Sequence, residues 1–289
     1  MVKRPSIEPH RQDSPSIPSH TMANGYPENK EHKGIVFPSP IFGPIRSRRL
    51  GISLGINLMP ADGKLCTFDC IYCECGFNCN HRPHLKRPTR AEVAAALETQ
   101  LLLMQAEGTV PDVLTFAGNG EPTAHPDFAG IIDDTIALRN RHCPNARVTV
   151  LSNATMSTKP AVHQALQRID NNIQKLDTVS ARYIHLVDRP TGAYDLEAVI
   201  QALCDFQGHV TIQTLFMKGT FEGKSVDNTT DDYVLPWIEV LKRIRPERVM
   251  VYTIDRETPA PDLLKATPDE LQRIGRLVEA AGMAVDIAY

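Results

Sequence analysis

The sequence predicts an α/β fold, an open partial barrel of about six strand–helix units. Short apolar runs alternate with amphipathic segments from Ile35 onward, as in parallel α/β proteins. The chain has 289 residues, 42% of them hydrophobic, which is enough to bury a full core. Six units are too few to close an eight-stranded barrel, so we expect the sheet to remain open.

Six segments have the length and apolar content of buried strands. They are Ile52–Leu58, Val113–Ala117, Val148–Leu151, Ile173–Asp177, Val210–Phe216 and Arg248–Ile254. A last run, Ala284–Ala288, is a seventh candidate. Because helices separate these segments, we predict mostly parallel strands joined by right-handed crossovers. Functional side chains are then expected at the carboxyl ends of the strands.

Two capping boxes mark the starts of helices. Thr89 and Glu92 precede one apolar stripe, and Thr267 and Glu270 precede that of the last helix, which Gly282 ends. The other helices are expected near Phe128–Leu138, Ala161–Ile169, Leu196–Phe206 and Leu235–Arg243.

The first residues differ in composition from the rest. Residues 1–34 are rich in Pro, Ser and His with little apolar periodicity, so we expect a flexible N-terminal extension before one domain of residues 35–289. Irregular coil that packs loosely on the domain is the alternative. The net charge of -3 gives no overall field that favours nucleic acid or a membrane. No secretory signal or bilayer-length apolar run is visible, so we expect a cytoplasmic protein without a membrane partner.

Five of the seven cysteines are crowded into one segment, which is typical of metal or redox sites rather than of disulfide frameworks. Cys66, Cys70 and Cys73 have the spacing C-x3-C-x2-C. Three thiolates can hold three irons of a cubane cluster and leave the fourth iron open to another ligand. These three cysteines are therefore the candidate metal ligands.

The same segment leaves a zinc knuckle open as an alternative. Its ligands would come from Cys70, Cys73, Cys75, Cys79, His81 and His84. Structural zinc sites normally pair cysteines across a longer loop, so this alternative fits the spacing less well. Cys75 and Cys79 are also candidates for a second metal, although two thiolates alone make a thin site.

Polar motifs follow the second and third predicted strands. The second ends in Gly118-Asn-Gly120-Glu121-Pro, where glycines let a backbone approach a ligand beside a carboxylate; an ordinary turn is the alternative. The third ends in Ser152 and Asn153, which can hydrogen-bond a ribose or a carboxylate, or else form a cap or turn. Because the ends of parallel strands share an edge, we expect the two motifs to meet.

Together, the cysteine spacing and these motifs resemble the signature of the radical S-adenosylmethionine (SAM) superfamily. The resemblance implies a [4Fe-4S] cluster on the three cysteines, with SAM chelated to its open iron and cleaved to a 5′-deoxyadenosyl radical. It also implies that both strand-end motifs bind SAM, that Glu121 engages its amino group, and that Tyr72 lies against adenine. A core ring is the other interpretation of Tyr72. Asn119 departs from the superfamily's Gly-Gly-Glu-Pro pattern.

Further motifs resemble a group of iron–sulfur oxidoreductases related to the wyosine tRNA-guanine synthases. They are the run from Phe42 to Asn57, Lys175-Leu-Asp177, Arg189-Pro190 and Tyr252-Thr-Ile-Asp255-Arg256. The wyosine synthases carry a second cluster on cysteines upstream of the main motif, whereas no cysteine precedes Cys66 in this sequence. We therefore expect one cluster and a related radical chemistry rather than the wyosine reaction.

The sequence is thus interpreted as a radical SAM enzyme that takes hydrogen from a substrate such as a tRNA base or a small metabolite. Asp177, Asp255 and Arg256 end the fourth and sixth strands and are candidates to face that substrate, with scaffold ion pairs as the alternative. The expected electron donor is a flavodoxin- or ferredoxin-type protein. The alternatives are an activase of a glycyl-radical enzyme and a non-catalytic zinc or iron–sulfur module.

A basic stretch follows the cysteines, comprising Arg82, Lys86, Arg87 and Arg90. It can steer a phosphate-bearing substrate, RNA included, or a negatively charged reductant. A solvated charged face is the simpler interpretation.

Overall fold

The computed structural model describes residues 28–29, 34–47 and 51–289. Its main feature is an eight-stranded sheet with the order β13-β11-β8-β7-β6-β5-β4-β3. The strands are β3 (Ile41–Ser47), β4 (Gly51–Ile56), β5 (Val113–Phe116), β6 (Arg147–Ser152), β7 (Asn171–Lys175), β8 (Thr211–Leu215), β11 (Arg248–Tyr252) and β13 (Val285–Ala288). All neighbours are parallel except β3 and β4. The predicted open α/β barrel is confirmed, because β3 and β13 lie at opposite edges.

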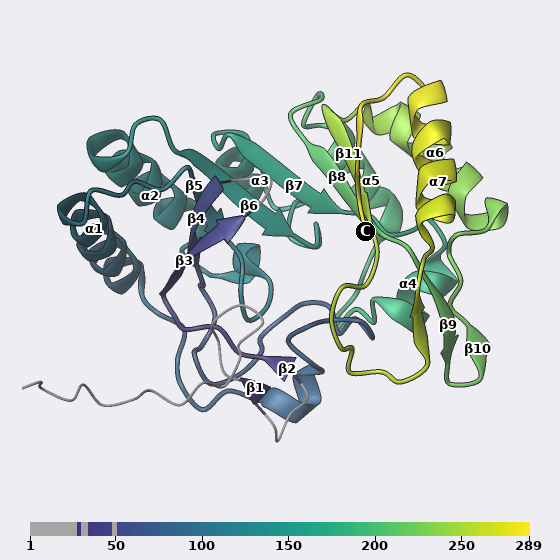
Figure 1. The fold of residues 1–289 in the computed structure, drawn as a ribbon, viewed down its shortest axis with the longest axis horizontal. Helices are drawn as coiled ribbons and strands as arrows, with labels where there is room; N and C mark the ends of the chain where they lie inside the picture. Colours follow the sequence, from purple (N-terminus) through teal and green to yellow (C-terminus); the bar gives the residue numbers. More distant parts are fainter. Residues whose placement is uncertain (1–27, 30–33, 48–50) are drawn as a thin grey trace, which may run out of the picture.

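Helices connect the parallel strands. They are α1 (Arg90–Ala106), α2 (Phe128–His142), α3 (Pro160–Leu166), α4 (Ala181–Val187), α5 (Leu196–Cys204), α6 (Asp231–Ile244) and α7 (Pro268–Ala280). In Figure 1, α1 and α2 lie at one end of the curved sheet and α6 and α7 at the other. Both predicted capping boxes, at Thr89 and Thr267, are formed. Among the described residues, no helix has both the length and the apolar character needed to cross a membrane.

The main core lies between the sheet and these helices. Leu54 of β4 and Phe116 of β5 belong to one buried cluster with Val93 and Leu97 of α1. Their burial contributes about 1.5–3 kcal/mol for each large apolar side chain. All four residues of β5 are buried, as expected for a parallel strand that is covered on both faces, so a continuous apolar run predicted this strand.

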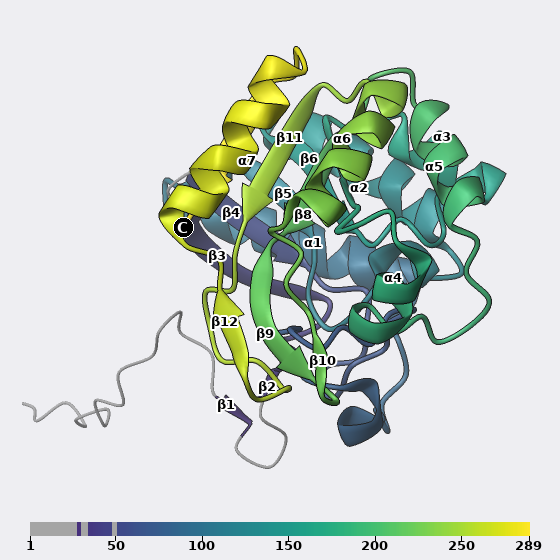
Figure 2. The same ribbon diagram turned by 90° about the vertical axis from the view of Figure 1, so that its right-hand side faces the viewer.

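Smaller elements surround one end of the sheet. The order β10-β9-β12 forms a second sheet from β9 (Met217–Phe221), β10 (Lys224–Ser225) and β12 (Leu263–Lys265), beyond the ends of β8 and β11 (Figure 2). A two-stranded pair, β1 (Glu28–Asn29) and β2 (Gly34–Ile35), precedes β3. The short 3₁₀ turns are η1 (Asn78–His81) and η2 (Pro122–Ala124). Most of the predicted extension, residues 1–34, lies outside the described residues, so its flexibility and the one-domain boundary stay predictions.

Candidate functional site

The cysteines lie in the connection between β4 and α1, and we call residues 64–78 the cysteine loop. Backbone hydrogen bonds tie this loop to distant parts of the barrel: Leu65 N to Asn119 O (2.9 Å), Asp69 N to Asp188 O (2.9 Å), Ile71 N to Val187 O (3.0 Å), Thr191 N to Thr67 O (2.9 Å) and Ala260 N to Ile71 O (3.2 Å). Ile71 is fully buried, in a second hydrophobic cluster with Leu215 and Ile254. Backbone hydrogen bonds and apolar packing therefore fix the position of the cysteine loop on the barrel.

The glycine motif after β5 packs directly against this loop. Gly120 has φ +141°, and a Cβ there would lie 2.0 Å from the carbonyl oxygen of Leu65. Gly118 has φ +127°, and a Cβ there would meet the side chain of Asn57 at 2.7 Å. Both glycines are therefore required by close packing inside the protein. Contact of Gly118 and Gly120 with a cofactor stays a prediction.

Asn119, the departure from the superfamily pattern, has a structural role. Its side chain is 1% exposed, accepts a hydrogen bond from Phe37 N (2.7 Å), and donates to Phe37 O and Pro60 O (2.8 Å each). A buried amide with these partners fixes the segments on either side of β3 and β4. Asn119 thus supports the site from outside the cysteine loop.

Glu121, Ser152 and Asn153 meet beside the first cysteine, as the sequence predicts. The Glu121 carboxylate is buried and accepts hydrogen bonds from Thr123 N (3.0 Å) and Asn153 N (2.7 Å). Burial raises the pKa of Glu121, while hydrogen bonds from Asn153, Thr123 and Ser152 act in the opposite direction. Asn153 Nδ2 lies 3.6 Å from Cys66 Sγ. A carboxylate and an amide therefore border this thiol.

Tyr72 and Asp177 meet beside the second cysteine, where Lys175 joins them. Lys175 Nζ lies 3.2 Å from Cys70 Sγ, 3.0 Å from Asp177 Oδ2 and 2.7 Å from Asp188 Oδ1. The same ammonium lies 4.5 Å from the centre of the Tyr72 ring and hydrogen-bonds its hydroxyl, which also bonds Asp177. We call Tyr72, Lys175, Asp177 and Asp188 the lysine cluster.

The charged side chains of the lysine cluster are largely removed from solvent, and this shifts their pKa values. Burial raises the pKa of Asp188 to about 6; Lys175 opposes this shift and Asp177 adds to it. Burial alone would lower the pKa of Lys175, but Asp177, Asp188 and Cys70 raise it well above its usual value. The cation is therefore held between two carboxylates at the edge of the cysteine loop.

A further lysine, Lys64, is buried beside the thiols. Lys64 is 3% exposed; its Nζ donates to Gly76 O (2.7 Å) and lies 3.6 Å from Asp69 Oδ1. Burial alone would lower the pKa of Lys64, but Cys73, Cys66 and Cys70 raise it, together with Asp69. A buried ammonium needs anionic partners, and thiolates at the three motif positions would provide them.

The thiols themselves titrate differently. Burial raises the pKa of Cys66 to about 12, against the opposing effect of Lys64. Burial also raises the pKa of Cys70, against the effect of Lys175. A hydrogen bond with Cys75 lowers the pKa of Cys73, and Lys64 adds to this shift. The lysine cations therefore oppose the effect of burial and act in the direction of the thiolate form that metals require.

The residues present fit an iron–sulfur cluster. Lys175 and Asn153 give hydrogen bonds to sulfur, the kind of contact that tunes such clusters, and Asn78 Oδ1 is a buried acceptor without a partner among the described residues. No three His, Cys, Asp or Glu side chains converge on a single metal ion in the described part of the chain. A cubane cluster does not require the three thiolates to converge on one point, because each thiolate bonds a different iron.

The two predicted residues after β11, Asp255 and Arg256, lie outside the lysine cluster. Arg256 forms an ion pair with Glu74, between Cys73 and Cys75 in the cysteine loop, and therefore lies at its border. The Asp255 side chain is 73% exposed and lies 4.0 Å from Lys265. Roles for both in contacting a substrate stay predictions.

Sequence reasoning assigned no role to Lys64, Lys175 or Asp188. Lys175 stood in a quoted motif, and Asp188 immediately precedes Arg189-Pro190, so both were near a signal. Lys64 lies two residues before the first cysteine. The sequence signal that could have identified these residues was the position of a charged side chain in or next to a recognised motif.

Comparison with solved structures identifies the fold. A radical SAM methyltransferase from Sphaerobacter thermophilus superimposes with a TM-score of 0.60 and 13% identity, over 82% of this chain and 66% of that one. Streptococcus suis SuiB bound to S-adenosylmethionine superimposes with a TM-score of 0.54 and 14% identity, over 90% and 49%. The chain therefore has the fold of radical SAM enzymes. An archaeal TYW1 structure matches at a TM-score of 0.46 and 13% identity, and the wyosine branch stays a prediction.

Comparison of sequences gives the family. No protein-family model matches the chain. The UPF0026 protein of Synechocystis sp. is 28% identical over 227 residues, 77% of this chain and 78% of that protein. The UPF0026 protein of Helicobacter pylori strain J99 is 31% identical over 257 residues, 86% of this chain and 75% of that protein. At this identity and coverage, the chain belongs to the UPF0026 protein family.

Proposed function

We propose that this chain is a radical SAM enzyme that binds a [4Fe-4S] cluster through Cys66, Cys70 and Cys73. One observation carries the proposal: the Glu121–Asn153 pair and the lysine cluster border the same C-x3-C-x2-C loop, one beside Cys66 and the other beside Cys70. Both groups follow parallel strands at their carboxyl ends, where α/β proteins bind ligands. The fold shared with radical SAM enzymes supports it.

Cys66, Cys70 and Cys73 would hold the cluster, which would supply, when reduced, the electron needed to cleave a carbon–sulfur bond of SAM to methionine and a 5′-deoxyadenosyl radical. Glu121 would accept a hydrogen bond from the amino group of SAM, and Ser152 and Asn153 would orient its polar groups. Tyr72 would border the adenine. Lys64 and Lys175 would place positive charge beside the thiolates, in addition to their ion pairs with Asp69, Asp177 and Asp188.

A substrate bound beside SAM would give up one hydrogen atom to the radical, which would become 5′-deoxyadenosine. A flavodoxin- or ferredoxin-type protein would be the electron donor. A tRNA base or a small metabolite is the proposed class of substrate. Asp177, Asp255 and Arg256 are the proposed substrate contacts, with Asp177 nearest the cysteines through Tyr72 and Lys175.

The test is anaerobic reconstitution with iron and sulfide, followed by a 5′-deoxyadenosine assay with SAM and dithionite. The expected result is a brown protein that forms 5′-deoxyadenosine slowly without substrate. Replacing Cys66, Cys70 or Cys73 by Ala should abolish product formation, whereas Cys143→Ala, a buried cysteine at the end of α2, should retain it. Product formation by any loop variant, or bound zinc with no affinity for SAM, would refute the proposal.

A further inference from the structure

A cavity of about 670 Å³ lies beside the cysteine loop and contains none of its cysteines. Its walls come from the segment between η1 and α1, from the segment between η2 and α2, and from two residues before the first cysteine, Pro60 and Leu65. This volume is in the range of pockets that bind small molecules. The cavity is therefore large enough for a ligand the size of a nucleotide.

The residues that line the cavity carry more positive than negative charge. Arg82, Lys86 and Arg87 line it, with Asp127 as the one carboxylate among its lining residues. None of these three cations takes part in an ion pair within the described parts of the chain. By contrast, Arg90 is bound to Asp134 at 2.6 Å, outside the cavity. A positive cavity on a chain of net charge -3 attracts anions locally.

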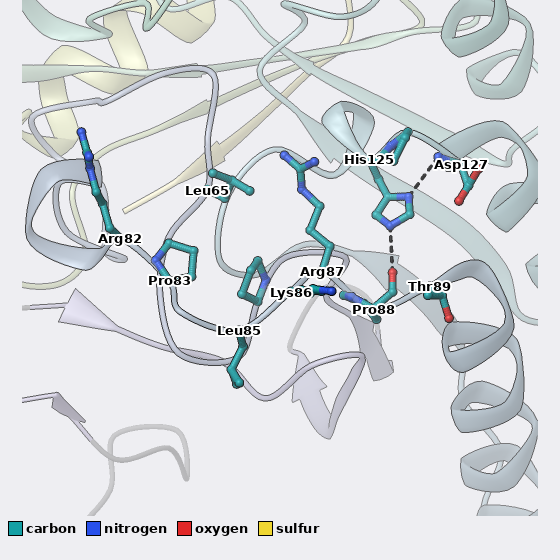
Figure 3. Close-up of a pocket in the computed structure, with 12 residues that line it drawn as sticks. Leu65, Arg82, Pro83, Leu85, Lys86, Arg87, Pro88, Thr89, His125 and Asp127 are labelled. Atoms are coloured by element: carbon teal, nitrogen blue, oxygen red, sulfur yellow. Dashed lines mark hydrogen bonds between the residues drawn. The ribbon is translucent and has the colours of Figure 1, made fainter.

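Arg87 gives the most direct indication that the cavity binds an anion. Its side chain extends between Leu65 and His125 in Figure 3. Its Nε is buried and has no hydrogen-bond partner among the described residues. A buried donor without a partner costs about 1–3 kcal/mol, so its presence calls for an acceptor that enters from outside. A guanidinium in this position is suited to phosphate oxygens.

The neighbouring side chains hold this geometry in place. His125 Nδ1 accepts a hydrogen bond from Asp127 N (3.1 Å), and Nε2 bonds Pro88 O (2.9 Å). Both ring nitrogens therefore have partners within the protein, and the imidazole connects the two wall segments. Asp62 accepts hydrogen bonds from the backbone of His84 (2.8 Å) and Leu85 (3.0 Å). The basic segment is thus held by contacts within the protein, through Asp62 and through His125.

The remaining walls are apolar. They are formed by Pro60, Leu65, Pro83, Leu85, Pro88 and Pro126. Cationic side chains among apolar walls suit a ligand that combines a phosphate with a flat organic body. We propose that this cavity binds the phosphate group of a nucleotide-sized phosphate ester, with Arg87 and Lys86 as its main contacts. The proposal does not depend on the iron–sulfur cluster.

Calorimetric titration of the full chain tests this proposal, with AMP, adenosine and inorganic phosphate as probes. AMP should bind, and adenosine should bind at least about tenfold more weakly because it lacks the phosphate. Arg87→Gln and Lys86→Gln should each weaken AMP binding by about tenfold or more. The control Arg90→Gln removes the same charge outside the cavity and should change affinity by less than about twofold. Circular dichroism verifies that each variant is folded.

A 5′-phosphorylated RNA tetranucleotide distinguishes the source of the phosphate. Binding about tenfold tighter than AMP identifies a strand end, and equal binding identifies a free nucleotide. Three results would overturn the proposal: equal binding of AMP and adenosine, unchanged AMP affinity in both cavity variants, or a flavodoxin that loses affinity for Arg87→Gln while no phosphate probe binds. All can be measured on metal-free protein, so they are independent of the radical chemistry.

Discussion

The ammonium of Lys175 lies between two carboxylates with side chains only 1% and 3% exposed, Asp177 and Asp188. In such a group, removal of one partner costs far more than the intact arrangement gains, since a buried charge is left without compensation. The lysine cluster therefore makes the site sensitive to single substitutions that do not remove a cysteine.

We predict that Lys175→Met lowers the free energy of unfolding of the metal-free protein by about 3–5 kcal/mol, because Asp177 and Asp188 then face each other without a cation. Urea denaturation measures this. The matched control is Lys242→Met, whose ammonium pairs with Glu239 on the surface and should change stability by less than about 0.5 kcal/mol. A loss below about 1 kcal/mol for Lys175→Met would show that the cluster is solvated or rearranged.

At the scale of elements, the segment after β5 must reach the cysteine loop without any side chain between them. We predict that Gly120→Ala destabilises the protein by more than about 2 kcal/mol, since its Cβ would collide with backbone at a φ that favours glycine. Gly192→Ala is the control, because a Cβ there has nothing within 4 Å. Thermal unfolding of both variants decides, and a Gly120→Ala protein as stable as the control would contradict the packing.

The elements that the sequence predicted are those with a local signal. Buried apolar runs and capping boxes located the six central strands and the helices α1 and α7. β3 was missed because glycine and proline interrupt it, and α4 because it has seven residues. β9, β10 and β12 were missed because their two to five residues are partly exposed and pair only through tertiary contacts.

The candidate site divides in the same way. Cys66, Glu121 and Asn153 lie close together in the structure. The sequence indicated this neighbourhood because each residue belongs to a recognisable motif that follows a strand. Lys175 was not connected with Cys70, since 105 residues separate them and nothing local reports their contact. The exposure of Asp255 was equally hidden, because the direction of a chain after its strand depends on packing.

At the scale of the whole molecule, the iron content per chain tests whether the protein binds one cluster or, like the wyosine synthases, two. We predict about four irons per reconstituted chain, as one cubane requires, rather than about eight. Cys75 Sγ donates to Gly118 O at 3.4 Å and so acts as a structural thiol. Cys75→Ala and Cys79→Ala should therefore leave iron content and SAM cleavage nearly intact. Iron near eight, or loss of half of it in either variant, would restore a two-cluster mechanism.

The hydrogen bonds that tie the cysteine loop to the rest of the barrel have a consequence for tolerance to mutation. Leu65, Asp69 and Ile71 are each anchored to backbone more than fifty positions away, after β5 or at the end of α4. A substitution that shifts either of those segments would therefore move the backbone of the three cysteines, even though it lies far from them in the sequence.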